Sequence, residues 1–78
     1  MINQYSAYIV RTTDKGNIRY YKLDIEKTLF NDYCVERKYG NIKFKSHTGV
    51  RINYFKDKEQ AIRFFDIILR SKNRKGYQ

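Results

Sequence analysis

The sequence predicts an α+β fold: an antiparallel meander sheet of about four strands, with one C-terminal helix packed on one face. Three observations lead to this prediction. Apolar and polar residues alternate with a period of two in several short segments up to Phe55. After Asp57 the apolar period changes to three or four, as in an amphipathic helix. No βαβ crossover and no phosphate-binding glycine loop is recognisable between the predicted strands.

The first two predicted strands form a hairpin. Residues 6–13, SAYIVRTT, are rich in β-branched and aromatic side chains. The following Asp14-Lys15-Gly16-Asn17 predicts a turn in which Gly16 or Asn17 adopts positive φ. In residues 17–26, the side chains of Tyr21, Leu23 and Ile25 share one face. We expect that face to be buried and the other to be solvated.

Two more strands follow a polar break at Asn31-Asp32. Residues 33–39 alternate, so the side chains on one face are those of Tyr33, Val35, Arg37 and Tyr39. The segment KFKSHTG, residues 43–49, predicts a charged loop. Residues 50–55, VRINYF, predict the last strand. The side chains of Val50, Ile52 and Tyr54 are expected to point inward. Those of Arg51 and Asn53 are expected to point outward.

The helix is predicted from its apolar stripe and its ends. Asp57-Lys58-Glu59-Gln60 resembles a capping box, with Asp57 as N-cap and Gln60 returning the bond. Gly76 is a natural residue just beyond the helix C-terminus. The residues that form the apolar stripe are Ala61, Ile62, Phe64, Phe65, Ile68 and Leu69.

Residues 1–78 are expected to form a single domain, because a second core would not fit in so short a chain. A hydrophobic content of 41%, with 8 Tyr and 5 Phe, excludes a disordered tail. The lone Cys34 cannot form an intramolecular disulfide, and no secretion signal or membrane-spanning run is recognisable. We therefore expect a cytoplasmic protein that does not bind membranes.

The charge is large and unevenly distributed. The net charge is +9. Residues 1–39 carry 7 Lys/Arg against 5 Asp/Glu, whereas residues 40–78 carry 10 against 3. Such asymmetry favours a polyanionic partner, although a basic composition also serves solubility alone.

No constellation of residues indicates an enzyme. The single histidine, His47, falls in the charged loop and is expected to be solvated. Cys34 has no histidine near it in sequence, so nucleophilic catalysis has no support. The carboxylates of Asp24, Glu26 and Glu36 are interleaved with lysines, which favours cross-strand ion pairs over acid–base chemistry. We predict no catalytic residue, no metal site and no cofactor.

Four segments together resemble the WGR domain, a family named for a Trp-Gly-Arg motif. They are NIRYYKLDI, YCVERKYGNI, INYFKDKEQAIRFFDIILRSK and the ending RKGY. That domain occurs in DNA-dependent poly(ADP-ribose) polymerases and in bacterial proteins, some of which are little more than the domain. The resemblance runs almost from end to end and implies the fold predicted above.

The resemblance also implies a site. In the polymerases the motif's tryptophan and arginine approach nucleic acid near a strand break. Those positions correspond here to Tyr39 and Asn41, with Gly40 between them, and Lys43 and Phe44 replace the Gly-Thr that often follows. Tyr39 keeps a ring that can stack, but Asn41 lacks the charge and the bidentate fork that suit phosphate.

Nearby basic residues are expected to compensate for the lost arginine. The predicted nucleic-acid-binding residues are Lys38, Tyr39, Gly40, Asn41, Lys43, Lys45 and Arg51. Each has a structural alternative: Tyr39 as a core or rim ring, Gly40 as a backbone requirement, Asn41 as a turn residue, and the lysines as a solvated face.

Two functions remain open from the sequence. The favoured one is a non-catalytic nucleic-acid-binding module, with DNA preferred and little sequence specificity. The alternative is a protein–protein interaction adaptor whose basic surface docks on an acidic partner.

Overall fold

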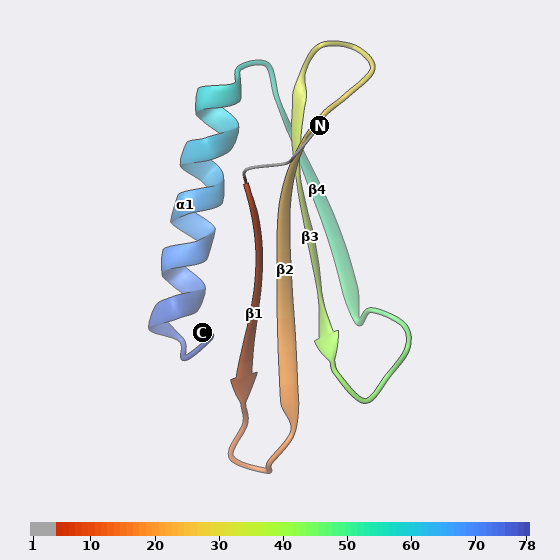
Figure 1. Cartoon of the computed structure of the whole chain (residues 1–78), viewed down its shortest axis with the longest axis vertical. Helices are drawn as coiled ribbons and strands as arrows, with labels where there is room; N and C mark the ends of the chain where they lie inside the picture. Colours follow the sequence, from red (N-terminus) through yellow and green to blue (C-terminus); the bar gives the residue numbers. More distant parts are fainter. Residues whose placement is uncertain (1–4) are drawn as a thin grey trace.

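The computed structural model describes residues 5–78 and confirms the predicted α+β architecture (Figure 1). Four strands precede one helix. Their bounds are β1 (Ser6–Thr12), β2 (Ile18–Lys27), β3 (Tyr33–Asn41), β4 (Gly49–Phe55) and α1 (Lys58–Arg74).

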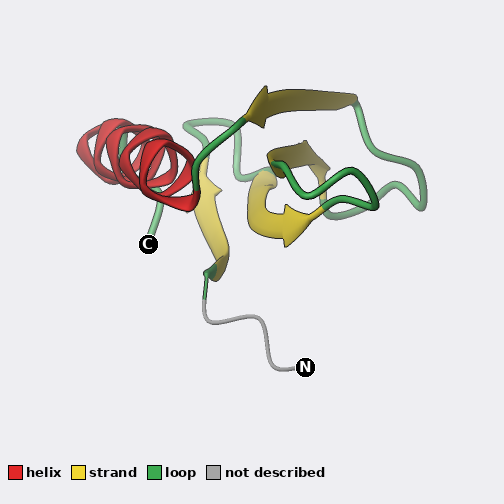
Figure 2. Ribbon diagram, turned by 90° about the horizontal axis from the view of Figure 1, so that it is seen from above, coloured by secondary structure: helices red, strands yellow, loops and turns green. Residues whose placement is uncertain are grey.

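The strands pair in sequence order as an antiparallel meander, β1-β2-β3-β4. Helix α1 lies on one side of this sheet and leaves the other side uncovered by any helix among residues 5–78 (Figure 2). We call these two sides the helix face and the open face. Odd-numbered residues of every strand lie on the helix face, because Ile9, Tyr21, Tyr39 and Gly49 occupy successive paired positions across the sheet.

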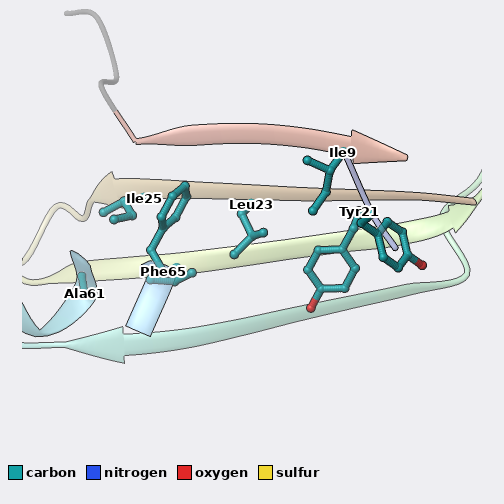
Figure 3. Close-up of a cluster of buried hydrophobic side chains, with 8 residues drawn as sticks. Ile9, Tyr21, Leu23, Ile25, Ala61 and Phe65 are labelled. Carbon is teal, nitrogen blue, oxygen red and sulfur yellow. The ribbon is translucent and has the colours of Figure 1, made fainter. Parts of the chain in front are cut away.

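The core lies between the helix face and α1. Leu23 of β2 and Val35 of β3 are completely buried, and Ala61 and Phe65 of α1 pack against them. Figure 3 shows the ring of Phe65 and the ring of Tyr21 over β2, with Leu23 between them. The predicted inward residues of β2 and the predicted stripe of α1 are therefore confirmed.

The β1–β2 and β2–β3 turns are held by hydrogen bonds within each turn. At the β1–β2 turn, the Thr13 N–H donates to the Asn17 carbonyl at 2.8 Å and Gly16 has φ 81°, one of the two positions predicted for positive φ. At the β2–β3 turn, Asn31 has φ 68° and the Thr28 hydroxyl donates to the Asp32 carboxylate. Asparagine tolerates this left-handed conformation better than other non-glycine residues.

The predicted orientation of β4 is wrong. Val50, Ile52 and Tyr54 lie on the open face and are exposed, whereas Arg51 and Asn53 lie on the helix face. The register explains the difference, because Tyr39 pairs with Gly49 and so places the odd residues of β4 under the helix. A shift of one residue in the preceding loop exchanges the two faces of a strand, and alternation alone does not show which face is inward.

The start of α1 also departs from the sequence-based expectation. Asp57 is the N-cap residue, as predicted, but its side chain makes no capping hydrogen bond. The Ala61 N–H donates to the Asp57 carbonyl at 3.3 Å, so the first helical bond comes from the backbone. The predicted reciprocal capping box is therefore not formed.

Just beyond the C-terminus of α1 lies Gly76, as predicted, with a φ of 102°. The Tyr77 N–H donates to the Lys72 carbonyl at 3.1 Å, and the Gly76 N–H donates to the Asn73 carbonyl at 3.1 Å. This pair of bonds is the Schellman motif, which requires a left-handed residue at the position that Gly76 occupies.

The Schellman turn directs the last residues back to the sheet. Tyr77 is buried in the core. Gln78 exchanges two backbone hydrogen bonds with Val10 of β1, at 2.9 Å and 3.1 Å. The outer edge of β1 is therefore partly covered by the end of the chain.

Two leucines provide a matched test of this core. Leu23→Ala should reduce the free energy of unfolding by about 2–5 kcal/mol, because it leaves a cavity in a fully buried site. Leu29→Ala, in the β2–β3 turn, should change it by less than about 0.5 kcal/mol, because Leu29 is 99% exposed. Chemical denaturation of both variants measures the difference. Equal losses would contradict the assigned core.

Candidate functional site

A pocket of about 350 Å³ opens on the helix face, beside the C-terminal end of α1. Residues from three strands, the helix and the C-terminal segment line it. Four of the seven lining residues are cationic and three are tyrosines, and there is no carboxylate among them. The lining residues are Arg19, Tyr21, Arg37, Tyr39, Arg51, Lys72 and Tyr77. We call this site the cationic pocket.

The tyrosines form its apolar wall. Tyr21 and Tyr39 are neighbours across β2 and β3 and stack almost parallel, with ring centroids 5.4 Å apart and planes inclined by 6°. Tyr77 meets Tyr21 edge-on at 6.0 Å. Tyr21 and Tyr77 are buried, whereas Tyr39 is only half-buried. Tyr39 is therefore a rim ring, supported from behind by Tyr21.

Arg37 is held against the wall of the pocket with one donor unused. Its Nη2 donates to Asn53 Oδ1 at 2.9 Å, and its guanidinium lies 5.3 Å from the ring centre of Phe64. Its Nε is buried and has no hydrogen-bond partner. A buried donor without a partner costs free energy, so Arg37 is held in this position by its other contacts.

Lys72 extends from the last turn of α1 across the tyrosines. Its Nζ lies 4.5 Å from the ring centre of Tyr21 and 5.9 Å from that of Tyr77, within the range of cation–π contacts. Desolvation lowers the pKa of Lys72, and the charges of Lys75 and Arg37 lower it further. The pocket thus contains cations that repel one another and have no anionic partner among its lining residues.

Arg51 of β4 completes the rim beside Tyr39. Its Nε donates to the Tyr39 hydroxyl at 3.4 Å, and this hydrogen bond raises the pKa of Arg51. Gly49, which pairs with Tyr39, makes this arrangement possible. A Cβ at Gly49 would overlap the Tyr39 ring, so the ring occupies the space that any other residue would fill.

The structure brings together only some of the residues predicted from the sequence. Tyr39 and Arg51 both line the cationic pocket. Lys38 lies on the open face, where its Nζ is 3.3 Å from Glu36 Oε1. Lys43 and Lys45 are exposed in the β3–β4 loop.

The other two residues of the Tyr-Gly-Asn motif have structural roles. Asn41 Oδ1 accepts a hydrogen bond from the Lys43 N–H at 2.9 Å, which fixes the start of the β3–β4 loop. Gly40 is buried on the open face, and a Cβ there would come within 2.9 Å of the Thr48 backbone nitrogen. Gly40 is therefore required because the loop folds closely over it.

The same loop covers part of the open face. His47 is exposed, yet its Nδ1 shares a hydrogen bond with the Tyr20 hydroxyl, so the expectation of a purely solvated histidine is wrong. Tyr20 is buried under His47 and stacks on Tyr8, with ring centroids 5.8 Å apart. The loop is thus anchored to the sheet.

Five residues of the pocket were missed in the sequence. They are Arg19, Tyr21, Arg37, Lys72 and Tyr77. For Arg37 a signal existed, since the alternation of β3 placed it on the same face as Tyr39. Tyr21 was predicted on the buried face of its strand, but not as a site residue. Arg19, Lys72 and Tyr77 are distant from Tyr39 in sequence, and only the sheet register and the Schellman turn bring them to it.

The open face has a different electrostatic character. Its lysines lie next to carboxylates on the same strand, since Lys22 Nζ is 3.9 Å from Asp24 Oδ2 and Lys38 is paired with Glu36. Exposed pairs such as these add little stability, but they reduce the local positive potential. On the helix face, by contrast, Arg19, Arg37 and Arg51 line the cationic pocket, and no carboxylate lines it with them.

The described residues show no other chemistry. Residues 5–78 contain no group of three or more side chains suited to hold a metal ion. Burial and the charge of Glu26 raise the pKa of Cys34, which disfavours the thiolate. No helix within residues 5–78 has the length and apolar character needed to cross a bilayer.

A comparison of the chain with known protein families agrees with the fold. The WGR domain model matches residues 5–78. The chain belongs to the WGR domain family. WGR domains are in general nucleic-acid-binding modules and are not catalytic by themselves.

A curated relative extends this comparison. The chain is 39% identical over 80 residues to "Uncharacterized protein y4dW" of Sinorhizobium fredii (strain NBRC 101917 / NGR234). All of this chain is covered, but only 38% of the relative's length, so the relative carries a similar region within a longer protein. No solved structure matches the chain with statistical significance.

Gly49 provides a test of how the rim is built. Gly49→Ala should displace the Tyr39 ring and lower the free energy of unfolding by about 1–3 kcal/mol, because the new methyl group overlaps the ring. NMR cross-peaks between the rings of Tyr21 and Tyr39 should weaken or disappear. Val50→Ala, one residue further on the open face, serves as the control and should leave them intact. Unchanged cross-peaks in both variants would contradict the packing of Tyr39 over Gly49.

Proposed function

We propose that this WGR domain is a non-catalytic nucleic-acid-binding module that binds DNA through the cationic pocket and its rim. The single observation that carries the proposal is the lining of the pocket. Three arginines and one lysine converge there on a tyrosine wall, with no carboxylate among the lining residues. A phosphodiester backbone offers the charge and the acceptor oxygens that such a lining lacks.

The arginines suit phosphate in geometry as well as in charge. A guanidinium presents a planar fork of donors that matches two phosphate oxygens. Arg37 lines the pocket from β3, and Arg19 and Arg51 come from the strands on either side of it. The motif position of Asn41 carries no charge, so in this proposal arginines of β2, β3 and β4 take over the phosphate contact.

The tyrosine wall supplies the second kind of contact. Tyr39 is half-buried at the rim and supported by Tyr21, so it is rigid enough for a sugar or base to pack against it. Phosphate contacts and stacking do not read base edges, so we expect little sequence specificity.

In this proposal, a bound nucleic acid that runs past the end of the sheet also meets the β3–β4 loop. Lys43, Phe44 and Lys45 are all exposed there, and Phe44 is 66% exposed. The loop joins β3 to β4 at one end of the sheet (Figure 1), and Tyr39 and Arg51 are close in sequence to its two ends. We assign Lys38 only to the general positive field, because it is paired with Glu36 on the open face.

Fluorescence anisotropy with blunt, nicked and single-stranded DNA at three salt concentrations tests the proposal. If the four cations of the pocket contact phosphates, a plot of log affinity for duplex DNA against log salt concentration should have a slope of roughly −3 to −4. A preference for ends or nicks would show that the replacement of the motif arginine by Asn41 preserves end recognition. The absence of binding even at low salt would refute the proposal.

Substitutions in the pocket should separate charge from stacking. Arg19→Gln and Arg51→Gln should each reduce the salt slope by about 0.9, because each removes one phosphate contact. Tyr39→Ala should weaken binding by about 1–3 kcal/mol without changing the slope, because the ring carries no charge.

Two open-face lysines provide the controls for these variants. Lys22→Gln and Lys38→Gln remove the same charge from the opposite face of the same sheet, so they should change the slope little. Circular dichroism should show that all variants are folded. If the open-face variants lose as much affinity as the pocket variants, the binding surface lies elsewhere.

Lys72 provides a test by pH. Its pKa lies below the usual 10.5 in the free protein, since burial and neighbouring cations disfavour its charged form. Folding therefore carries a penalty while the pH is below that pKa, and the penalty is relieved as the pH rises through it. A phosphate in the pocket favours the charged form, so DNA should raise the pKa of Lys72 and binding should weaken at alkaline pH.

An NMR titration of the Lys72 side chain, with and without DNA, measures this shift. A Lys72→Arg variant identifies the resonance and keeps the positive charge. A titration midpoint that does not move when DNA is added would place the phosphate outside the pocket.

One observation favours the adaptor alternative. Leu29 and Phe30, in the β2–β3 turn, are 99% and 88% exposed, and hydrogen bonds within the turn hold its backbone, so they could contact a partner protein.

Competition distinguishes DNA binding from this alternative. If the cationic pocket binds an acidic protein, excess unrelated DNA should fail to displace that protein. Displacement by unrelated DNA would favour the nucleic-acid function.

A further inference from the structure

The outer edge of β4 is uncovered in the part of the chain that the structure describes, whereas the outer edge of β1 is partly covered. In the strand order β1-β2-β3-β4, only β1 and β4 are terminal, and Gln78 bonds the outer edge of β1 through Val10. No strand or helix of the described chain lies beyond β4 (Figure 1). A free strand edge presents a row of unpaired N–H and C=O groups that can pair with another chain.

The hydrogen-bond pattern shows which groups point outward. In an antiparallel strand, alternate residues direct their backbone groups to opposite neighbours. Val10 uses its groups for Gln78, so the odd residues of β1 bond β2, as the bond from the Ile25 N–H to the Tyr5 carbonyl confirms. By the same alternation, even residues of β2 bond β3, and odd residues of β3 bond β4. The odd residues of β4 therefore bond β3, and the backbone N–H and C=O groups of its even residues point away from the sheet.

The same even residues carry exposed apolar side chains. They are Val50, Ile52 and Tyr54, exposed by 50%, 44% and 65% on the open face. Native edge strands usually carry charges, a proline or a bulge that prevents pairing. On its open face β4 carries none of these, and its only charge, Arg51, lies on the helix face.

We propose that two copies of this chain pair antiparallel through β4, with the two-fold axis at Ile52. The axis then places Ile52 opposite Ile52 of the second copy, and Val50 opposite Tyr54 of the second copy. All three outward-pointing residues bond in this register, and their apolar side chains meet on the open face.

Charge supports the same register. With the axis at Ile52, Arg51 faces the neutral Asn53 of the second copy. With the axis at Arg51, two arginines would lie directly opposite each other, which is destabilising. With the axis at Asn53, Val50 would lie opposite residue 56, beyond the end of β4. The sequence of β4 is thus self-complementary about its central residue.

The proposed dimer is one continuous eight-stranded sheet, because its axis is perpendicular to the sheet. Both helices and both cationic pockets would lie on the same side of it. Each copy carries a net charge of +9, so the copies repel at low salt. Added salt should therefore strengthen dimerisation, whereas it weakens DNA binding, and the two processes can be separated by their opposite salt dependence.

Register-specific cross-linking tests the proposal in a Cys34→Ser background, which removes the natural thiol. Residues directly paired at the axis have Cα atoms about 5.5 Å apart, within the range of a disulfide. Ile52→Cys should therefore give a covalent dimer on mild oxidation. Val50→Cys should not, because the two thiols would be four residues apart along the strand, or about 13 Å.

Mass measurement by light scattering provides the second test. At high protein concentration and moderate salt, the natural chain should have about twice its monomer mass of 9.5 kDa. Ile52→Pro should be monomeric, because it removes an outward N–H that β3 does not use. Ile67→Lys is the control, since Ile67 is 60% exposed on α1, away from the proposed interface.

Two results would overturn the proposal. One is a natural chain that stays monomeric up to its solubility limit at every salt concentration. The other is a Val50→Cys variant that cross-links as readily as the Ile52→Cys variant, which would show random collision. If Ile52→Pro is unfolded by circular dichroism, Ile52→Lys replaces it, because it sets two like charges face to face at the axis.

Discussion

The pairing of Tyr39 with Gly49 is the constraint on which the rest of this structure depends. It sets the register of β4 against β3, and through that register it decides which side of β4 faces the helix. The ring of Tyr39 takes the space that a side chain at Gly49 would fill, so the pair fits only in this combination. Arg51 then joins the cationic pocket, and the apolar side chains of β4 are left on the open face.

The sequence predicted the elements well because their signals are local. The alternation of β2, the period of α1 and the terminal Gly76 each depend on neighbours along the chain. The inward face of β4 could not be predicted in the same way, because both of its faces alternate equally well. Its apolar residues suggested the inward face, yet the register with β3 places Arg51 and Asn53 on the helix face and leaves Arg51 exposed there. Register is a property of two strands and a loop together.

Part of the candidate site could also be predicted from the sequence. The family resemblance pointed to Tyr39, and its neighbour Arg51 was expected from the opposing strand. Arg19, Lys72 and Tyr77 were out of reach, because nothing near them in sequence indicates that they meet. Lys38 shows the reverse difference, since closeness in sequence to the motif suggested a common surface, while the pleat of β3 directs Lys38 to the face opposite to Tyr39.

The substitution of the family motif is easier to understand with the pocket in view. Asparagine at position 41 is used to fix the start of the β3–β4 loop, through its bond to the Lys43 N–H. The positive charge of the site comes from arginines on three adjacent strands, each held by the sheet. If DNA binds there as proposed, the loss of one motif side chain is tolerated, because no single residue supplies the positive potential of the pocket.

The contact between Gln78 and Val10 has a consequence for how the chain folds. The three hairpins of the sheet close over short turns, so their formation requires little loss of chain entropy. The bond between the last residue and β1 instead joins the two ends of the domain, and it can form only when α1 has docked and the Schellman turn has reversed the chain. We therefore expect the hairpins to form early in folding and the contact between Gln78 and Val10 to form last. A substitution that weakens this contact should then increase the unfolding rate more than it decreases the folding rate.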